Sequence, residues 1–407
     1  VAMLVACCAL ASEKFSLSGS LQHDGLFAMT DASIGTETYS FPYLSNSYVS
    51  LLVSSSHLSA GLRLETMEVP LPGYESGFKG SGVGNLFVQA RWNWGRLTIG
   101  DVYSQFGSGL ILRLYEERSL GIDNSLRGAR LELTPYRGIR FNALTGKQRV
   151  YWNCYNNTAW NLDYTKGAVV GADIELDVHE WSPRLQDNDV TLNIGASWVS
   201  KYEGTDTIYY SLAPPTIYNL PRWVGAADGR VQVGYRNWNL LVEYAWKAND
   251  PSTDNAMSYK HGEALMLSTG YSRRGMSLLL QVKRIENMAF RSDRQLRGLS
   301  GSLNHLPPFT HAHTYNLAAL HTYATQPQGE WAFQAEWRQT WKRHTPMGGR
   351  YGTTIGLHAS HIRGTDSEGW WKMSKEPYYT DVNIELNKKI SKRWSINAMY
   401  MYQTYNR

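Results

Sequence analysis

Polar and apolar side chains alternate along residues 330–342. The odd positions are mostly large and apolar, whereas the even positions are mostly polar or charged; the apolar set is Trp331, Phe333, Ala335, Trp337 and Trp341. Because successive side chains of a strand point to opposite faces, this alternation predicts a β-strand with one apolar and one polar face. A helix would not separate the two sets in this way.

The same alternation recurs in other stretches of the chain, at residues 86–94, 240–247 and 382–387. A strand of this length, with tryptophans towards its ends and a charged reverse face, suits a transmembrane β-barrel, whose outer wall meets lipid and whose inner wall meets water. An aromatic-rich soluble β-sandwich is the alternative, but repeated long strands with so polar a reverse face are less common there. The pattern therefore favours the barrel.

Extended along the chain, the pattern predicts an all-β fold, an antiparallel transmembrane β-barrel with about 16–18 strands and more in the intact protein. The candidate strands lie at residues 15–28, 47–54, 57–68, 85–94, 96–104, 125–134, 138–149, 167–178, 190–200, 229–236, 238–247, 262–272, 276–285, 313–323, 330–342, 350–361, 378–388 and 393–404. The lipid-facing aromatic side chains are expected to include Trp92, Trp94, Trp246, Trp331, Phe333, Trp337 and Trp341.

Short and long connections alternate between these strands. The short ones fall at Gly95, 135–137, Asn237, 273–275 and 389–392, and the long ones at 105–124, 150–166, 201–228, 248–261, 286–312 and 362–377. Outer-membrane barrels have short periplasmic turns and longer extracellular loops. The alternation therefore predicts a bacterial outer-membrane location with the long loops extracellular and the short turns periplasmic.

Composition agrees with this interpretation. The chain has 407 residues, 43% of them hydrophobic, and a mean hydropathy of -0.40, with 15 Trp, 26 Tyr and 10 Phe. No run of 18 apolar residues follows the start of the chain, so transmembrane helices are excluded. The aromatic residues suit the girdles at the two membrane interfaces. The formal charge of +5 is spread along the chain, which argues against a nucleic-acid partner.

The two ends of the chain differ from the barrel pattern. Residues 1–11 are apolar and resemble the remnant of a signal peptide, followed by a single barrel domain over 12–407. A lipoprotein processing site, with a lipid on Cys7, is the alternative to cleavage after Ala11. The last expected strand runs straight to Arg407 rather than ending on an aromatic residue, and we therefore expect a sequence that is truncated at its C-terminus.

The segment 101–128 is the densest cluster of charge and glycine. Because short and long connections alternate, it is expected at the end of the barrel that carries the long loops. Its apolar centre, 110–112, predicts that it folds inward as a constriction of the lumen. The lumen or constriction candidates are Arg113, Arg118 and Arg127, which would face Glu116, Glu117 and Asp123. The alternative is that these charges pair with one another only to hold the loop.

No pattern for catalysis or for a cofactor is legible. Residues 80–84 are glycine-rich, but a strand rather than a helix follows them, so a phosphate loop is not expected. His311 and His313 share a strand face, yet no third ligand can be identified from the sequence, so no metal site is expected. No nucleophile and base arrangement is visible either, and the sequence predicts neither an enzyme nor a bound cofactor.

Three stretches resemble a known family: 69–80, 101–128 and 145–152. Together they are similar to an uncharacterised, domain-of-unknown-function family of Bacteroidota outer-membrane β-barrel proteins. The resemblance implies an outer-membrane barrel of a Gram-negative cell and brings no activity, ligand or catalytic residue with it. The abrupt start and end depart from a complete barrel.

The sequence thus predicts an integral outer-membrane barrel that acts as a porin-like pore or channel of unknown substrate. A non-conducting barrel subunit or scaffold of a larger outer-membrane complex is the main alternative. The expected partners are outer-membrane lipid and other barrels or lipoproteins. A lipid-modifying barrel enzyme and a soluble binding protein are weaker alternatives.

Overall fold

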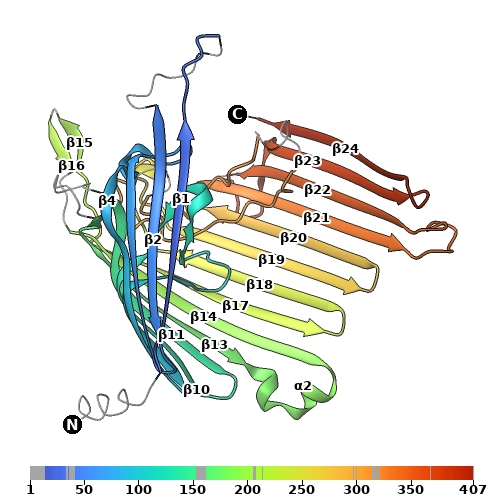
Figure 1. Cartoon of the computed structure of the whole chain (residues 1–407), viewed down its shortest axis with the longest axis horizontal. Coiled ribbons are helices and arrows are strands. Elements are labelled where there is room, and N and C mark those ends of the chain that lie inside the picture. The colour runs from blue at the N-terminus through green and yellow to red at the C-terminus, as the bar shows by residue number, and fades with distance from the viewer. Residues whose placement is uncertain are drawn as a thin grey trace.

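The computed structural model is built almost entirely of antiparallel β-strands (Figure 1). It describes residues 14–33, 35, 42–152, 162–204, 208–212, 214–296, 298, 300–313, 319, 321–366 and 368–406. One sheet contains 18 strands, and there is almost no helix. The all-β antiparallel prediction is therefore confirmed. Within the described ranges, no helix is long and apolar enough to cross a membrane.

Seventeen long strands form the sheet, and each pairs antiparallel with the next long strand along the chain. They are β1 (Ser16–Phe27), β2 (Tyr43–Ser54), β3 (Leu58–Val69), β4 (Gly80–Trp92), β5 (Gly95–Val102), β10 (Leu126–Tyr136), β11 (Ile139–Trp152), β13 (Ala168–Asp177), β14 (Val190–Tyr202), β17 (Trp223–Tyr235), β18 (Trp238–Lys247), β19 (Gly262–Arg273), β20 (Met276–Glu286), β21 (Gly329–Trp341), β22 (Thr353–Thr365), β23 (Met373–Lys389) and β24 (Ser395–Tyr405). The short β12 (Leu162–Tyr164) adds to the edge of β11.

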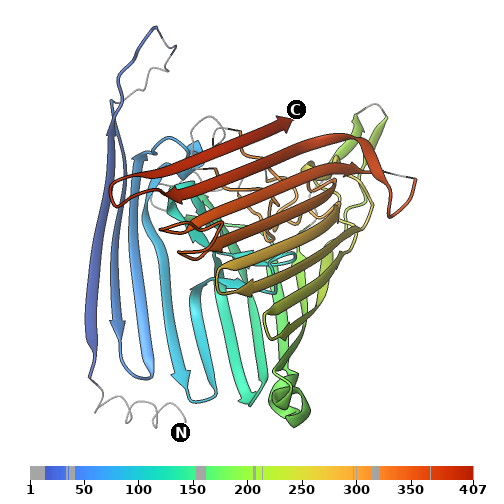
Figure 2. The ribbon, with the colours of Figure 1, turned by 90° about the vertical axis from the view of Figure 1, so that its right-hand side faces the viewer.

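The sheet curls around an interior, so that it has a concave and a convex face (Figure 2). Its first and last strands, β1 and β24, are its two edges, and no hydrogen-bonded pairing joins them among the described residues. The right-handed twist of the strands accumulates from neighbour to neighbour and produces the curl.

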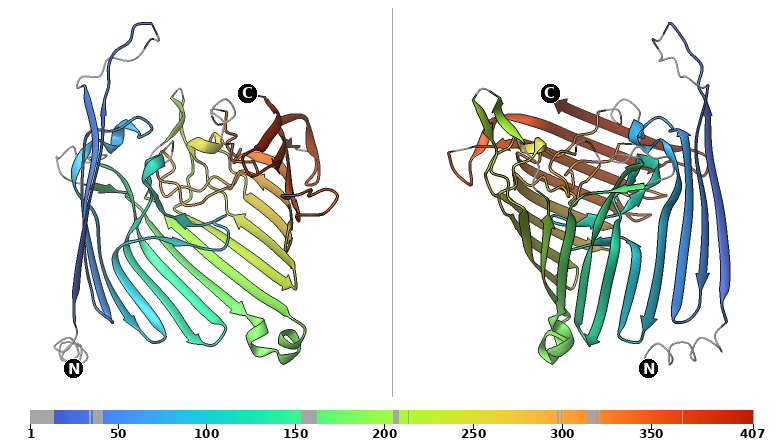
Figure 3. Two further views of the ribbon diagram at one scale, coloured as in Figure 1. Left: turned by 45° about the vertical axis from the view of Figure 1, so that its right-hand side comes forward. Right: turned by 90° about the vertical axis from the view of Figure 1, so that its left-hand side faces the viewer.

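The connections differ in length at the two ends of the strands (Figure 3). At one end β17 and β18 are joined through Arg236 and Asn237, and β19 and β20 through Arg274 and Gly275. Gly275 has a φ of 87°, a left-handed conformation that suits glycine in a tight hairpin turn. Two connections at this end are longer: the β13–β14 connection, which holds η3 (Val178–Trp181) and α2 (Pro183–Asp187), and the β21–β22 connection, residues 342–352.

The other end carries the long connections and their small elements. These are η1 (Ser76–Phe78), the β6 (Ser104–Gln105) and β7 (Arg113–Leu114) hairpin, the β8 (Glu116–Glu117) and β9 (Ile122–Asp123) pair, η2 (Arg118–Leu120), the β15 (Tyr209–Leu212) and β16 (Pro215–Ile217) hairpin, and η4 (Thr253–Asn255). The expected alternation of short and long connections is thus present in the fold.

One expected strand is wrong. Residues 313–323 are not a strand wherever the structure describes them, and residues 314–318 and 320 lie outside the described ranges. At the end of this stretch, Tyr323 is buried and donates a hydrogen bond to Glu330. The expected signal remnant 1–11, with Cys7, also lies outside the described residues.

The predicted aromatic residues of the outer wall differ in exposure. Trp94 and Trp246 are exposed, and most of the others are half-buried. Trp331 is instead buried, because Trp370 and Trp371 from the β22–β23 connection pack against it at ring-centroid distances of 6.0 and 6.1 Å. Trp331 therefore departs from the expectation of a wholly lipid-facing side chain.

Candidate functional site

The connection between β5 and β10, residues 103–125, folds into the interior, and we call it the first inward segment (Figure 3). Within it β6 pairs with β7, so that residues 106–112 form the tip of a hairpin. Phe106, Leu110, Ile111 and Leu112 are fully buried in this tip. Their burial explains why the segment leaves solvent, since fully burying each such side chain contributes about 1.5–3 kcal/mol.

The opposite wall of the interior holds the tip in place. The backbone N–H of Ser108 donates to both carboxylate oxygens of Glu243 on β18, at 3.1 Å each. The preceding Gly107 has a φ of 51°, and a Cβ at this position would lie 2.6 Å from Oε1 of Glu243. Glycine is therefore required both by the backbone conformation and by the close approach.

The described part of the connection between β20 and β21, residues 287–296, 298, 300–313, 319 and 321–328, forms a second inward segment that packs against the first. The N–H of Arg113 donates to the carbonyl of Leu303 at 2.7 Å, and the N–H of His305 donates to the carbonyl of Gly109 at 2.9 Å. The side-chain amide of Asn304 donates to the carbonyl of Leu110 at 3.0 Å. The two segments thus form one backbone-bonded unit across the interior.

Small side chains on the strands make room for this unit. The apolar cluster joins the two segments to the concave face of β5 and of most strands that follow it. Four nearby strands each contribute an alanine to it, at Ala226, Ala245, Ala264 and Ala332. Two lysines hold the second segment, since Lys247 donates to the carbonyl of Ala289 at 2.6 Å and Lys283 donates to the carbonyl of Pro307 at 2.5 Å.

Two of the predicted constriction residues join a buried charge network. Asp123 accepts from Arg63 at 2.8 Å and from Arg149 at 2.5 Å, and Glu116 accepts from Arg63 at 2.7 Å. Glu65 completes the network between the two arginines. Arg63 and Glu65 on β3, and Arg149 on β11, were not identified from the sequence, although an arginine and a glutamate two positions apart share a strand face.

The remaining predicted residues have other partners. Arg118 forms an ion pair with Glu116 at 2.7 Å, as the sequence suggested. Arg127 pairs instead with Asp101, and Glu117 accepts from Ser119 at the start of η2. The guanidinium of Arg113 lies 4.5 Å from the centre of the Tyr115 ring. Five of the six residues therefore lie in the first inward segment and Arg127 lies on β10, but only part of their predicted pairing occurs.

Polar groups line the concave face beyond the inward segments. Ion pairs connect neighbouring strands there, between Arg96 and Glu132 and between Arg140 and Glu175. A further ion pair, between Arg230 on β17 and Asp173 on β13, spans the intervening β14. A pocket of about 450 Å³ lies against β18 to β23, and its lining includes Asn239, Glu336, Arg338 and His358. A polar wall of this kind can contact water and polar solutes. The apolar cluster around the inward segments narrows the path through the interior.

His305 makes the contact between the two segments sensitive to pH. Burial, with Arg113 and Lys283 nearby, lowers the pKa of His305 to about 4, below its usual value of 6.5. A depressed histidine pKa stabilises the packed state above pH 6.5, and this contribution is lost as the pH falls towards 4. Amide hydrogen exchange in the first inward segment should therefore accelerate between pH 7 and pH 5, after correction for the intrinsic exchange rate.

The variant His305→Phe should lose this acceleration, whereas His57→Phe, in the exposed β2–β3 turn, should retain it. Equal pH dependence in both variants would show that another group controls the packing.

Comparisons with known proteins give one family match and several structural likenesses. The model of a family of unknown function, DUF6029, matches residues 1–407. No curated protein matches the sequence. The structure is similar to those of Pseudomonas aeruginosa OpdL (14% identity, TM-score 0.45, 97% of this chain and 95% of that chain covered) and OpdQ (11%, 0.46, 97% and 94%), and Acinetobacter baumannii OccAB4 (10%, 0.46, 96% and 93%). At these identities, the activity of this chain has to be argued from its own residues.

Proposed function

We propose that this chain, which belongs to the DUF6029 family of unknown function, is a porin-like channel of the bacterial outer membrane. The observation that carries the proposal is the combination of a curled sheet with a polar concave face and two inward segments that narrow its interior. Channels need a water-lined path and a constriction that selects solutes. Both parts are built here from the chain's own strands and connections.

The distribution of charge supports a water-filled path. The concave face holds ion pairs and a pocket with histidine, arginine and carboxylate groups. The convex face of β21 carries Phe333, Trp337 and Trp341, and Trp337 lies in register with Leu278 and Leu357. A lipid bilayer tolerates the aromatic convex face but not the charged concave face. We accordingly assign Trp92, Trp94, Trp246, Phe333, Trp337 and Trp341 to the lipid-facing wall.

The membrane setting is part of the same proposal. With the long connections outside the cell, the inward segments enter the interior from the extracellular end, and the short turns face the periplasm. A Gram-negative cell of the Bacteroidota would fit the family resemblance. Outer-membrane lipid would be the main partner, with other barrels or lipoproteins as further partners. The function is transport rather than catalysis.

Planar-bilayer recording on the purified chain tests this function. We expect stepwise conductance, because the constriction is narrow but is lined in part by charged groups. The conductance steps should persist in a solution of high salt. Cell fractionation should recover the protein in the outer membrane and release it only with detergent. Repeated incorporation into bilayers without any conductance steps would contradict the channel.

A non-conducting barrel subunit is the second candidate, and one observation favours it. The apolar cluster joins both inward segments to the concave face of most strands, so the interior is filled by protein at that level. A filled barrel could serve as a scaffold within a larger outer-membrane complex. Co-purification of stoichiometric lipoproteins or other barrels in mild detergent, together with silent bilayers, is the result that this candidate predicts.

A further inference from the structure

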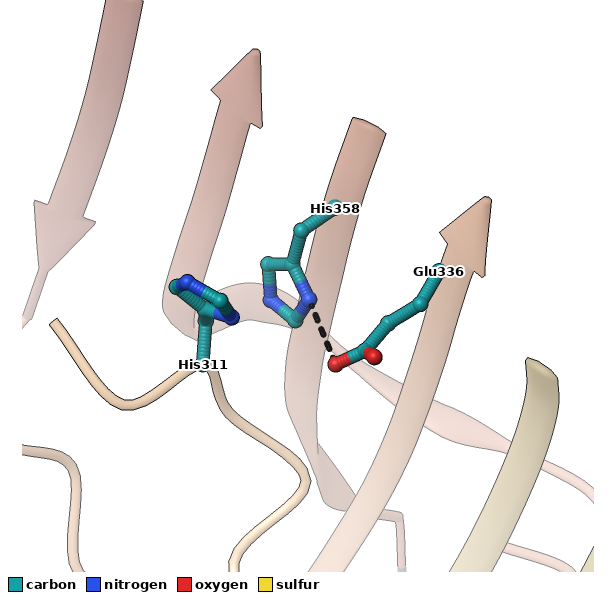
Figure 4. A group of neighbouring side chains, drawn as sticks. All are labelled: His311, Glu336 and His358. Atoms are coloured by element: carbon teal, nitrogen blue, oxygen red, sulfur yellow. Dashed lines mark hydrogen bonds and ion pairs between the residues drawn. The ribbon is translucent and has the colours of Figure 1, made fainter. Parts of the chain in front are cut away.

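Three side chains with metal-ligating atoms meet on the concave face (Figure 4). His311 comes from the second inward segment, Glu336 from β21 and His358 from β22. One ligand atom from each lies within 4.8 Å of those of the other two. The sequence alone could not bring them together, because His311 lies 25 residues from Glu336 and 47 from His358 in the numbering.

The environment of His358 matches that of a metal-bound histidine. Its Nδ1 lies 3.1 Å from Oε1 of Glu336, whereas its Nε2 lies 2.9 Å from the hydroxyl of Ser360. Behind the hydroxyl, Oδ2 of Asp381 lies 3.8 Å from the same Nε2. Metal-ligating histidines usually donate their second ring N–H to an oxygen that fixes the orientation of the ring. Ser360 and Asp381 provide such oxygens, which leaves Nδ1 for an ion.

The segment that carries the third ligand is also held in position. The ring of His311 lies 4.7 Å from that of His358, between centroids. Two residues further along, Nε2 of His313 lies 2.8 Å from Oδ2 of Asp381, and the side chain of His313 is almost fully buried. This contact fixes the second inward segment against β23. Asp381 is fully buried and its Oδ1 has no hydrogen-bond partner, so an unsatisfied carboxylate oxygen lies directly behind the cluster.

One side of the cluster is open to the interior. The side chains of Glu336 and His311 are 40% and 30% exposed, and both line the pocket of about 450 Å³. Zinc sites that contact substrate or solvent use three protein ligands and keep a fourth position free, with two histidines and one glutamate as an established set. The present cluster has this composition and this opening.

We propose that His311, Glu336 and His358 bind a divalent transition-metal ion of the zinc class, with a fourth coordination position facing the interior. Two ligand atoms of a tetrahedral zinc ion lie about 3.3 Å apart, close to the 3.1 Å between His358 and Glu336. Rotation of the His311 side chain brings in the third ligand. The two histidines favour zinc, nickel or copper over magnesium and calcium, which prefer oxygen ligands.

This site is tested by calorimetric titration of the purified full chain, in detergent, with ZnCl₂. We expect one saturable site per chain, and at least about 10-fold weaker binding in His311→Ala and in Glu336→Gln. The matched control is His261→Ala, a histidine–glutamate position outside the cluster, which should bind zinc as the unmodified chain does. Co²⁺ in place of zinc should give the strong visible absorption of a four-coordinate site.

Two outcomes would overturn the proposal. One is the absence of saturable zinc binding, and the other is equal binding by the cluster variants and the His261→Ala control. Circular dichroism of each variant separates loss of a ligand from loss of the fold. Because binding is measured without a membrane, the result is independent of whether the chain conducts.

Discussion

Replacement of Arg149 by methionine should lower the stability of the folded chain by about 3–5 kcal/mol. The side chain of Arg149 is 2% exposed and forms ion pairs with Glu65 and Asp123. Methionine fills much of the same volume but leaves two buried carboxylates without this partner. The cost therefore comes from uncompensated buried charge rather than from a cavity. Urea unfolding of the protein in lipid vesicles measures the loss.

Arg140→Met on the same strand is the matched control. Arg140 also pairs with two carboxylates, Glu175 and Asp177, but half of its side chain is exposed. Water screens such a pair, so the loss should stay below about 1 kcal/mol. Similar losses in the two variants would show that the network around Arg149 is solvated rather than buried.

Trp337→Arg should impair membrane assembly strongly. Trp337 lies on the convex face of β21, in register with Leu278 and Leu357 on the neighbouring strands. An arginine on a lipid-facing wall costs about 2–4 kcal/mol near the bilayer midplane. The effect is measured as the fraction of the protein that reaches the heat-resistant folded form in vesicles. Gel mobility distinguishes this form from the unfolded chain.

Arg338→Ala, one residue away, tests the opposite face. Arg338 is exposed on the concave face, in register with Ser277 and Gly356, and it lines the pocket. Its loss should leave assembly intact and alter only the selectivity of the interior. If both variants assembled equally well, or both failed, the assignment of the two faces of β21 would be incorrect.

Local alternation was enough to predict most of the sheet. The period of two residues in 330–342 and 240–247 corresponds to β21 and β18, because alternate side chains on a strand meet different surroundings. The pattern failed at 313–323, where apolar residues also alternate but the described residues form no strand and Tyr323 is buried. A period of two residues indicates that one face of a segment is buried, but it does not indicate which part of the protein covers that face.

The interior could be predicted only in part, because its contacts join distant parts of the chain. The apolar residues 110–112 indicated an inward segment, but not its contact with Glu243. The partners of Asp123, which are Arg63 and Arg149, lie 60 and 26 residues away. The same limit applies to His311, whose proposed co-ligands come from two strands. Such contacts depend on strand register, which no local pattern specifies.

Single-channel conductance of a tip variant tests the constriction most directly. Residues 106–112 are replaced by Asn-Gly, which suits the two-residue turn that the pairing of Gln105 with Arg113 allows. The constricted channel predicts stepwise conductance for the unmodified chain and a severalfold larger step for the variant, in the same bilayers and salt. Identical steps in the two proteins, or silence in both despite correct folding, would contradict a channel whose width is set by the first inward segment.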